Sequence, residues 1–322
     1  MFYKKIIIPT QPHPDTIVAI FLLKKFGEEK FPGIKEAQIE IKSVITQKET
    51  EENLAKQGIL ILDLGGGKFD HHNKKNQTLS DLVADDLEIK DDPALTKLLQ
   101  YARRDDIFGK GIISTDLLDR AFGLSALIAN LNKSLIGNPN RVVDIILPIL
   151  TAHYNEEERR TKLLPRELEK KIKSEEVLIF EIKSDEKKIK IIMIKSDNPS
   201  MAGYLKSQIG GKFDIVVQCL SSGHINILTR PTKRINLKGL AAAIRLKEAE
   251  FSGINLEINA NELMKYGRLN EAPQWYYDPA TNSLLNGGLN PQGIESTKIK
   301  WEDFSNILKI AFSKNFLEKL FH

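Results

Sequence analysis

The sequence predicts an α/β protein with a Rossmann-like parallel-sheet domain, a helical connector and a smaller mixed α/β C-terminal domain. Three observations support this fold class. Strand-like and helix-like segments alternate in the first part of the chain, a charged helical stretch follows, and a strand-rich pattern then starts again. With 322 residues, of which 41% are hydrophobic, the chain can bury a substantial core, and its length favours two domains.

The N-terminal half begins with buried strands and a helix. Apolar runs bounded by polar residues predict strands at 4–9, 37–45 and 58–64, and an apolar helix is expected at 15–27. This alternation is typical of a parallel sheet, because parallel strands need a crossover between them. Further helices are expected, with Gly and Pro marking their ends, at 93–104, 114–132 and 140–154.

The charged stretch Asn155–Glu176 predicts a solvated connecting helix. We therefore expect one domain at 1–160 and a second at 175–322. In the second domain, strands are predicted at Val177–Ile182, Ile189–Ile194, Phe213–Leu220 and His224–Thr229, and helices at Ser200–Ile209, Leu237–Glu248 and Trp301–Leu320. The segment 251–300 is rich in Pro and Gly, which predicts loops.

The composition excludes several classes of protein. No apolar run approaches the roughly 20 residues of a membrane span, and the N-terminus lacks a cleavable signal pattern, so we expect a cytoplasmic protein. Cys219 is the one cysteine, which excludes an internal disulfide and a cysteine-rich zinc site; we expect a buried thiol. The net charge of +4 is compatible with an anionic substrate but too small to establish nucleic-acid binding.

The most informative stretch is the end of the third predicted strand and the turn after it. The apolar run Ile59–Leu62 leads into Asp63, three glycines and the triplet Asp70-His71-His72. Glycines let the chain reverse direction, so the triplet can return beside Asp63. Carboxylate and imidazole ligands together suit Mn²⁺, Fe²⁺ or Zn²⁺ better than Ca²⁺. This pattern indicates a metal site.

A second group of ligand-type residues follows the first predicted strand. His13 and Asp15 stand between that strand and the apolar helix. In an open parallel sheet, ligands bind beyond the carboxyl ends of the strands, so both groups point to the same place. Taken singly, Asp15 reads as a helix N-cap and Asp63 as a residue that stabilises a glycine turn. Their order and their common position at strand ends favour one shared metal site.

At these residues the chain resembles the DHH phosphoesterase superfamily, which is named after the triplet that stands here as Asp70-His71-His72. The resemblance covers about residues 4–110 and involves four motifs in order. These are His13-Pro14-Asp15, Asp63 at the end of a later strand, the triplet, and an Asp that follows a helix. For the fourth motif the sequence offers Asp105 and Asp106, and we choose Asp105 over its neighbour.

Two departures from the family pattern affect what the resemblance implies. Many members carry a second Asp two residues after the first, where this chain has Ile17. With this gap the motifs are closest to the melanocyte-proliferating-gene exonuclease-like branch, and they leave open whether one or two ions bind. The C-terminal half is similar only in outline to the DHH-associated domain, because its glycine segment around Gly287-Gly288 lacks the expected His.

The resemblance implies a site for one or two Mn²⁺ ions, with Mg²⁺, Fe²⁺ and Zn²⁺ as the other candidates. Asp63 would be the bridging ligand, and His72 would either lie behind the metal ligands or contact the phosphate. These two are the expected catalytic residues. The expected metal ligands are His13, Asp15, Asp63, His71 and Asp105. The cations expected to bind the substrate phosphate are Lys74, Arg103, Arg104, Arg230 and Arg234.

The expected function is that of a metal-dependent phosphoesterase that hydrolyses a phosphodiester in a nucleotide or a short single-stranded nucleic acid. Two alternatives remain open. One is a non-catalytic nucleotide-binding, nucleic-acid-binding or regulatory protein on a degenerate fold of this type. The other is a pyrophosphatase-like phosphoanhydride hydrolase, which the string Pro14-Asp15-Thr16 suggests. No membrane partner is expected, and the sequence leaves the oligomeric state open, a homodimer included.

Overall fold

The computed structural model describes residues 2–47, 49–74, 76–108, 115–184, 187–313 and 316. The chain forms two compact units, Met1–Lys162 and Leu163–His322. Each unit has its own sheet and its own hydrophobic core.

Unit 1 contains a three-stranded parallel sheet, as the sequence predicts. Strands β1 (Lys5–Ile8), β2 (Gln38–Ile41) and β3 (Ile59–Ile61) lie in the order β2-β1-β3. Both neighbours pair with β1 in parallel. The side chain of Asn140 bonds both backbone groups of Ile39, at 2.7 and 2.8 Å. This contact satisfies polar groups of the edge strand β2.

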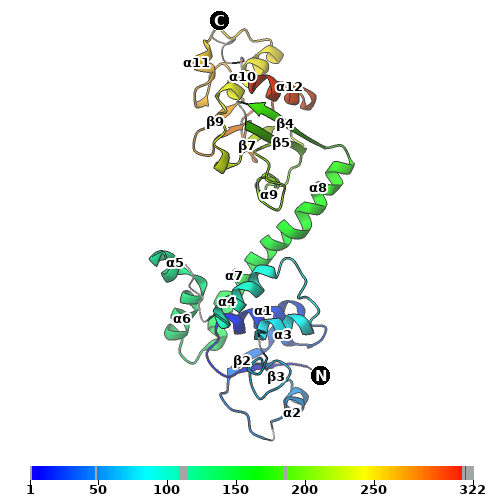
Figure 1. The fold of residues 1–322 in the computed structure, drawn as a ribbon, viewed down its shortest axis with the longest axis vertical. Helices are drawn as coiled ribbons and strands as arrows, with labels where there is room; N and C mark the ends of the chain where they lie inside the picture. The colour runs from blue at the N-terminus through cyan, green and yellow to red at the C-terminus, as the bar shows by residue number, and fades with distance from the viewer. Residues whose placement is uncertain are drawn as a thin grey trace. The chain divides into compact units, whose positions relative to one another are not determined.

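Helix α1 (Pro14–Phe26) is the centre of this unit. Ten of its residues, from Pro14 to Leu23, are buried, because helices pack on it from several sides. Its neighbours are visible in Figure 1; α3, α4 and α7 contact it directly. The helices of unit 1 after α1 are α2 (Glu51–Lys56), α3 (Leu79–Asp86), α4 (Thr96–Asp106), α5 (Leu117–Phe122), α6 (Leu124–Ser134) and α7 (Pro139–Glu158).

One predicted helix differs from the structure, and the predicted connecting helix is found. The single helix expected at 114–132 is divided into α5 and α6, because Gly123 adopts an extended conformation (φ −63°, ψ 149°) and caps both; residue 114 lies outside the described residues. The expected connecting helix is present. It continues from α7 through a π-helical turn at Arg159–Leu163 into α8 (Leu164–Lys173), and the boundary between the units falls in that turn.

Unit 2 is built on a seven-stranded mixed sheet in the order β4-β5-β6-β7-β10-β9-β8. Strands β5 and β6 pair in parallel, and the other neighbours are antiparallel. The strands are β4 (Val177–Ser184), β5 (Lys187–Lys195), β6 (Ile215–Cys219), β7 (Ile225–Thr229), β8 (Gly267–Arg268), β9 (Tyr276–Asp278) and β10 (Ser283–Leu285). The mixed C-terminal domain is thus confirmed.

The segment 251–300, expected to be rich in loops, also contains the short helix at Ala260–Leu263 and the strands β8, β9 and β10. The three strands are not predicted from the sequence. Each has only two or three residues, which is too short for an alternating pattern to stand out in the sequence. Within β5 the alternation is clear: Ile191 and Met193 face one core, and Ile192 and Ile194 face another.

Helices cover both faces of the sheet of unit 2. Helices α10 (Lys238–Ser252) and α12 (Trp301–Ala311) contribute to the core on one face, and α9 (Met201–Lys206) contributes to the core on the other. The short α11 (Ala260–Leu263) packs on α10. The fully buried Arg245 of α10 donates hydrogen bonds to the carbonyls of Leu263, Lys265 and Gly267. Among the described residues, the helices are all too short or too polar to cross a membrane.

Candidate metal centre

The candidate centre lies where strands β1 and β3 end. These strands are parallel neighbours, so the segments that follow them leave from the same edge of the sheet. The segment after β1 carries His13 and Asp15, and the segment after β3 carries Asp63. Asn132 of α6 donates a hydrogen bond of 2.9 Å to the carbonyl of Pro12, which fixes the loop just before His13.

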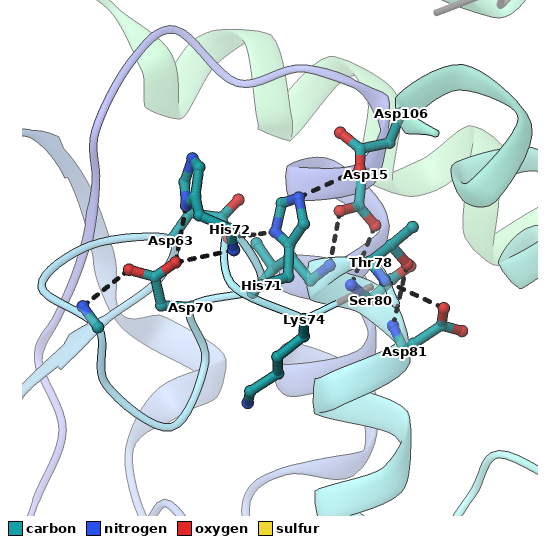
Figure 2. Close-up of polar contacts among 12 residues, drawn as sticks. Asp15, Asp63, Asp70, His71, His72, Lys74, Thr78, Ser80, Asp81 and Asp106 are labelled. Atoms are coloured by element: carbon teal, nitrogen blue, oxygen red, sulfur yellow. Dashed lines mark hydrogen bonds and ion pairs between the residues drawn. The ribbon is translucent and has the colours of Figure 1, made fainter. Parts of the chain in front are cut away.

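Asp63 has a left-handed backbone conformation, with φ at +51°. Gly65 and Gly66 follow it with φ of +76° and +69°, a conformation that glycine adopts without strain and that reverses the chain, as expected from the sequence. The amide of Asp63 donates to the carbonyl of Phe69 at 2.8 Å, which closes the turn. The turn therefore returns Asp70, His71 and His72 to the side of Asp63, as Figure 2 shows.

The imidazole of His71 lies between two carboxylates. Its Nδ1 is 2.5 Å from Oδ1 of Asp63, and its Nε2 is 3.2 Å from Oδ2 of Asp106 (Figure 2). Hydrogen bonds to Asp106 and Asp63 raise the pKa of His71 to about 10. The same contact with His71 holds the pKa of Asp106 below its ordinary value. Without a metal ion, the two carboxylates thus favour a protonated His71.

Asp15 is fully buried at the start of α1, and both its oxygens bond the first turn of α3. Oδ2 accepts from the amide of Leu79 at 2.8 Å, and Oδ1 accepts from that of Ser80 at 3.0 Å. Burial raises the pKa of Asp15. The two amides belong to a helix N-terminus, where a negative charge is stabilised. Asp15 therefore joins α1 to α3 and is held in one position.

The same turn of α3 is closed by a capping box. Thr78 accepts from the amide of Asp81 at 3.3 Å, and Asp81 accepts from the amide of Thr78 at 3.1 Å. The sequence Thr78-x-x-Asp81 carries this signal, so sequence reasoning could have located the helix start that holds Asp15.

The structure brings together Asp15, Asp63 and His71. One donor atom from each lies within 4.8 Å of the others, and the three side chains are buried or nearly so. This set combines two carboxylates and an imidazole, which fits a divalent transition-metal ion such as Mn²⁺, Fe²⁺ or Zn²⁺. The donor atoms of these three residues therefore lie close enough together to bind one ion.

Asp63 also belongs to a second group of donors, with Asp70 and His72. Oδ1 of Asp70 accepts from the backbone amide of His72 at 3.1 Å and lies 2.7 Å from Nδ1 of its ring, while Oδ2 accepts from the amide of Gly66 at 2.8 Å. The ring of His72 stacks on that of His71 with centroids 5.1 Å apart. The side chain of His72 is 64% exposed, so Asp70 orients a ring that faces solvent.

A cleft of about 530 Å³ lies next to the two groups of donors. Its lining includes His13, Asp63, His71, His72, Lys74 and Asp106. His13 lines the cleft but supplies no atom to either group of donors among the described residues. The ammonium of Lys74 donates to the carbonyl of Lys68 at 3.1 Å, which holds this predicted phosphate-binding cation at the cleft.

The choice of Asp105 over Asp106 has to be corrected. Asp105 accepts a hydrogen bond of 2.7 Å from the hydroxyl of Ser125 in α6, whereas Asp106 lines the cleft and contacts His71. Successive residues of a helix are about 100° apart around its axis, so two neighbours cannot face the same site. Of the two candidates for the fourth motif, Asp106 is therefore the one that lies at the cleft.

Three of the predicted phosphate-binding arginines have partners within their own unit, and the two that belong to unit 1, Arg103 and Arg104, do not line the cleft. The guanidinium of Arg103 binds both oxygens of the fully buried Asp81 at 2.8 to 3.0 Å, which ties α4 to α3. Arg104 lies over the ring of Tyr101, 5.9 Å from its centroid. Arg230 forms an ion pair with the buried Asp214 in unit 2. Arg234 lines a separate cavity of unit 2.

Ile17 occupies the position where a second motif Asp is expected. Its side chain is 0% exposed and belongs to the core around α1. The position therefore supplies packing and offers no donor for an ion.

Comparisons with known proteins give remote likenesses. No protein-family model matches the chain, and no curated protein matches it. Among solved structures, the chain is similar to an uncharacterised protein from Helicobacter pylori G27, with 12% identity and a TM-score of 0.26 over 96% of this chain and 99% of the other. It is also similar to the DHH domain of a protein described as belonging to a family of ribosomal proteins. That match has 12% identity and a TM-score of 0.28 over 98% of this chain and 87% of the other.

Proposed function

We propose that the chain is a metal-dependent phosphoesterase of the DHH type that hydrolyses a phosphodiester in a nucleotide or a short single-stranded nucleic acid. The observation that carries the proposal is the convergence of donor atoms from Asp15, Asp63 and His71 within 4.8 Å, at the edge of a parallel sheet and under an open cleft. The sequence order of these residues, which matches the DHH motifs, adds to this support.

Asp15, Asp63 and His71 would hold the ion, and Mn²⁺ is our first choice. A bound ion of this kind lowers the pKa of water and polarises phosphoryl oxygens. Asp15 is positioned by the amides of Leu79 and Ser80, so its geometry is set before an ion arrives. Asp106 accepts from the far nitrogen of His71 and orients the ring, as a carboxylate commonly does behind a metal-binding histidine.

His72 and Lys74 are the residues that we assign to the substrate. Nδ1 of His72 donates to the carboxylate of Asp70, and Nε2 of this exposed ring would donate to a phosphoryl oxygen when the ring is in its imidazolium form. Lys74 adds a positive charge on the same cleft. The carboxylates around His71 would repel an anionic substrate, and these two residues offset that repulsion.

The buried Ile17 favours a centre with one ion held by three residues. The second candidate is a nucleotide-binding or regulatory protein that keeps the fold without turnover. Ile17 is compatible with it too, because the position offers no donor for a second ion. We also propose that the chain belongs to the exonuclease-like branch, and this assignment depends on Ile17 standing where other members have a second Asp.

The test is metal content combined with turnover. Protein purified without chelator should contain about one divalent ion per chain, and it should hydrolyse a chromogenic phosphodiester when Mn²⁺ is added. Asp63→Asn should abolish both, and it should fold, because Asn is one of the few residues that accept the left-handed backbone found at this position. Metal bound without turnover of mononucleotide esters, short RNA, short DNA or pyrophosphate would favour the second candidate. No metal and no turnover would overturn the proposal.

A further inference from the structure

Unit 2 contains a cavity of about 630 Å³ that has no part in the metal centre. It lies where β7 ends and α10 begins, beside the turn that joins β9 to β10. Its lining includes the cations Lys206, Arg234 and Lys238 and the aromatic residues Tyr266 and Tyr277. No Asp or Glu is among the lining residues, so the cavity is positively charged.

Within the part of the chain that the structure describes, the three cations are without ionic partners. Lys206, Arg234 and Lys238 form no ion pair with any residue in the described ranges, whereas the nearby Arg230 is paired with Asp214. Lys206 is half-buried, and this burial lowers the pKa of its ammonium. A cation partly removed from water without a counter-ion is unfavourable, so Lys206 favours an anion in the cavity. Arg234 and Lys238 are exposed at the same cavity and add positive charge.

Hydrogen bonds fix the walls of this cavity. The side-chain amide of Asn282 donates to the carbonyl of Ile235 at 2.8 Å and to the hydroxyl of Thr229 at 3.2 Å. The hydroxyl of Thr229 donates back to the carbonyl of Asn282 at 2.7 Å. These bonds join the β9–β10 turn to the end of β7 and to the segment before α10. The cavity is therefore formed before a ligand enters.

An aromatic surface lies beside the cations. The ring of Tyr266 packs on the buried Tyr277, with centroids 4.8 Å apart and an angle of 54°, yet Tyr266 remains 55% exposed. An exposed ring supported by a buried one can stack on a nucleobase without first becoming ordered. Cations for phosphate beside an aromatic surface for a base are the two elements of a nucleotide site.

A second cavity of unit 2, of about 440 Å³, fits an anion less well. It is lined by lysines and by Trp301, but also by Glu176 and Asp197. Glu176 neutralises Lys171 at 3.1 Å, and the ammonium of Lys195 already lies over the ring of Trp301, 5.4 Å from its centroid. A lysine and the aromatic ring of this cavity thus already have partners within the protein, which leaves less positive charge and less ring surface for a ligand.

We propose that the cavity at Lys206, Arg234 and Tyr266 binds a nucleoside phosphate, either a free nucleotide or one residue of a single strand. Lys206, Arg234 and Lys238 bind the phosphate, and the base stacks on Tyr266. This site goes beyond the proposed hydrolase function, because it lies in the other unit, needs no metal ion and is tested by binding.

The test uses the full chain in EDTA and calorimetric titration with three probes: inorganic phosphate, adenosine monophosphate and a six-nucleotide single strand. Lys206→Met and Arg234→Asn should each weaken binding of both nucleotide probes by about tenfold. Tyr266→Leu should weaken both by about tenfold as well, without changing the weak binding of phosphate. If the strand binds more tightly than the mononucleotide, the ligand of this cavity is single-stranded nucleic acid. If the mononucleotide binds more tightly, the ligand is a free nucleotide.

Two variants serve as controls. Lys212→Asn removes a positive charge outside the cavity, and it matches Arg234→Asn because φ is positive at both positions, +59° and +45°. Asp63→Asn alters the metal centre. Both should bind the probes as the native chain does, and thermal unfolding should confirm that all variants fold. Absence of nucleotide binding at millimolar concentration, an equal loss in Lys212→Asn, or phosphate binding as tight as that of the mononucleotide would overturn the proposal. Each of these results would leave the hydrolase proposal standing.

Discussion

Nε2 of His71 and Oδ2 of Asp106 lie 3.2 Å apart, although the two residues come from a turn after β3 and from the end of α4. This contact joins the triplet to the helix that closes the cleft. Because Nδ1 of the same ring already faces Asp63, Asp106 determines how the imidazole is oriented.

The first prediction compares two neighbouring carboxylates. Asp106→Asn should weaken Mn²⁺ binding by roughly 10- to 100-fold, because His71 loses the carboxylate that orients it. Asp105→Asn should leave the affinity unchanged, since Asp105 bonds Ser125 and does not line the cleft. Calorimetric titration with Mn²⁺ measures both. Equal affinities in the two variants would contradict the assignment of Asp106.

A second prediction concerns the role of Asp15 in folding. Asp15→Ala should lower the free energy of unfolding by about 2 to 4 kcal/mol, because two buried amides of α3 lose their acceptor. Asp15→Asn keeps one acceptor oxygen and should lose less stability, while losing metal affinity to a similar degree. Urea unfolding monitored by circular dichroism gives the stabilities. If both variants were as stable as the native chain, Asp15 would not hold α3.

The third prediction separates structural arginines from those that bind substrate. Arg103→Met should destabilise the chain by about 2 kcal/mol, since it leaves the buried carboxylate of Asp81 without its cation. The Michaelis constant for a phosphodiester should stay unchanged in the folded variant. Lys74→Met, which removes a cation from the cleft, should raise that constant and leave stability nearly unchanged. A larger effect of Arg103→Met on the Michaelis constant would assign Arg103 to the substrate after all.

A fourth prediction concerns Cys219. Burial raises the pKa of this thiol to about 12, so at pH 8 it stays protonated and only its thiolate would react. Its reaction with a disulfide reagent at pH 8 should be roughly a thousandfold slower in the native chain than in urea, where the pKa returns to about 8.5. The rate should rise with pH well above 8. A fast native reaction at pH 8 would show that the thiol is accessible.

The sequence predicts the features that depend on local pattern. The parallel strands, the helix after β1 and the glycine turn after β3 are legible because apolar runs, Gly and Asp mark them directly. The approach of the two strand ends follows from their parallel arrangement. Asp15, Asp63 and His71 could therefore be placed together from the sequence alone.

The remaining features depend on contacts between distant residues. The partners of Arg103 and Arg230 are Asp81 and Asp214, and no spacing in the sequence links these pairs. The choice between Asp105 and Asp106 depends on how α4 is rotated, which its packing determines. Strands β8 to β10 exist because a longer neighbour, β7, offers an edge for β10 to pair with.

The left-handed backbone at Asp63 also limits how this protein can change during evolution. Most residues are destabilised by about 1 to 2 kcal/mol in that conformation, while Gly, Asn and Asp adopt it readily. Of these three, Asp alone carries a charge. A lineage that abandons the centre but keeps the turn should therefore replace Asp63 with Asn or Gly, and such a replacement in a related chain would mark the loss of the chemistry while the architecture persists.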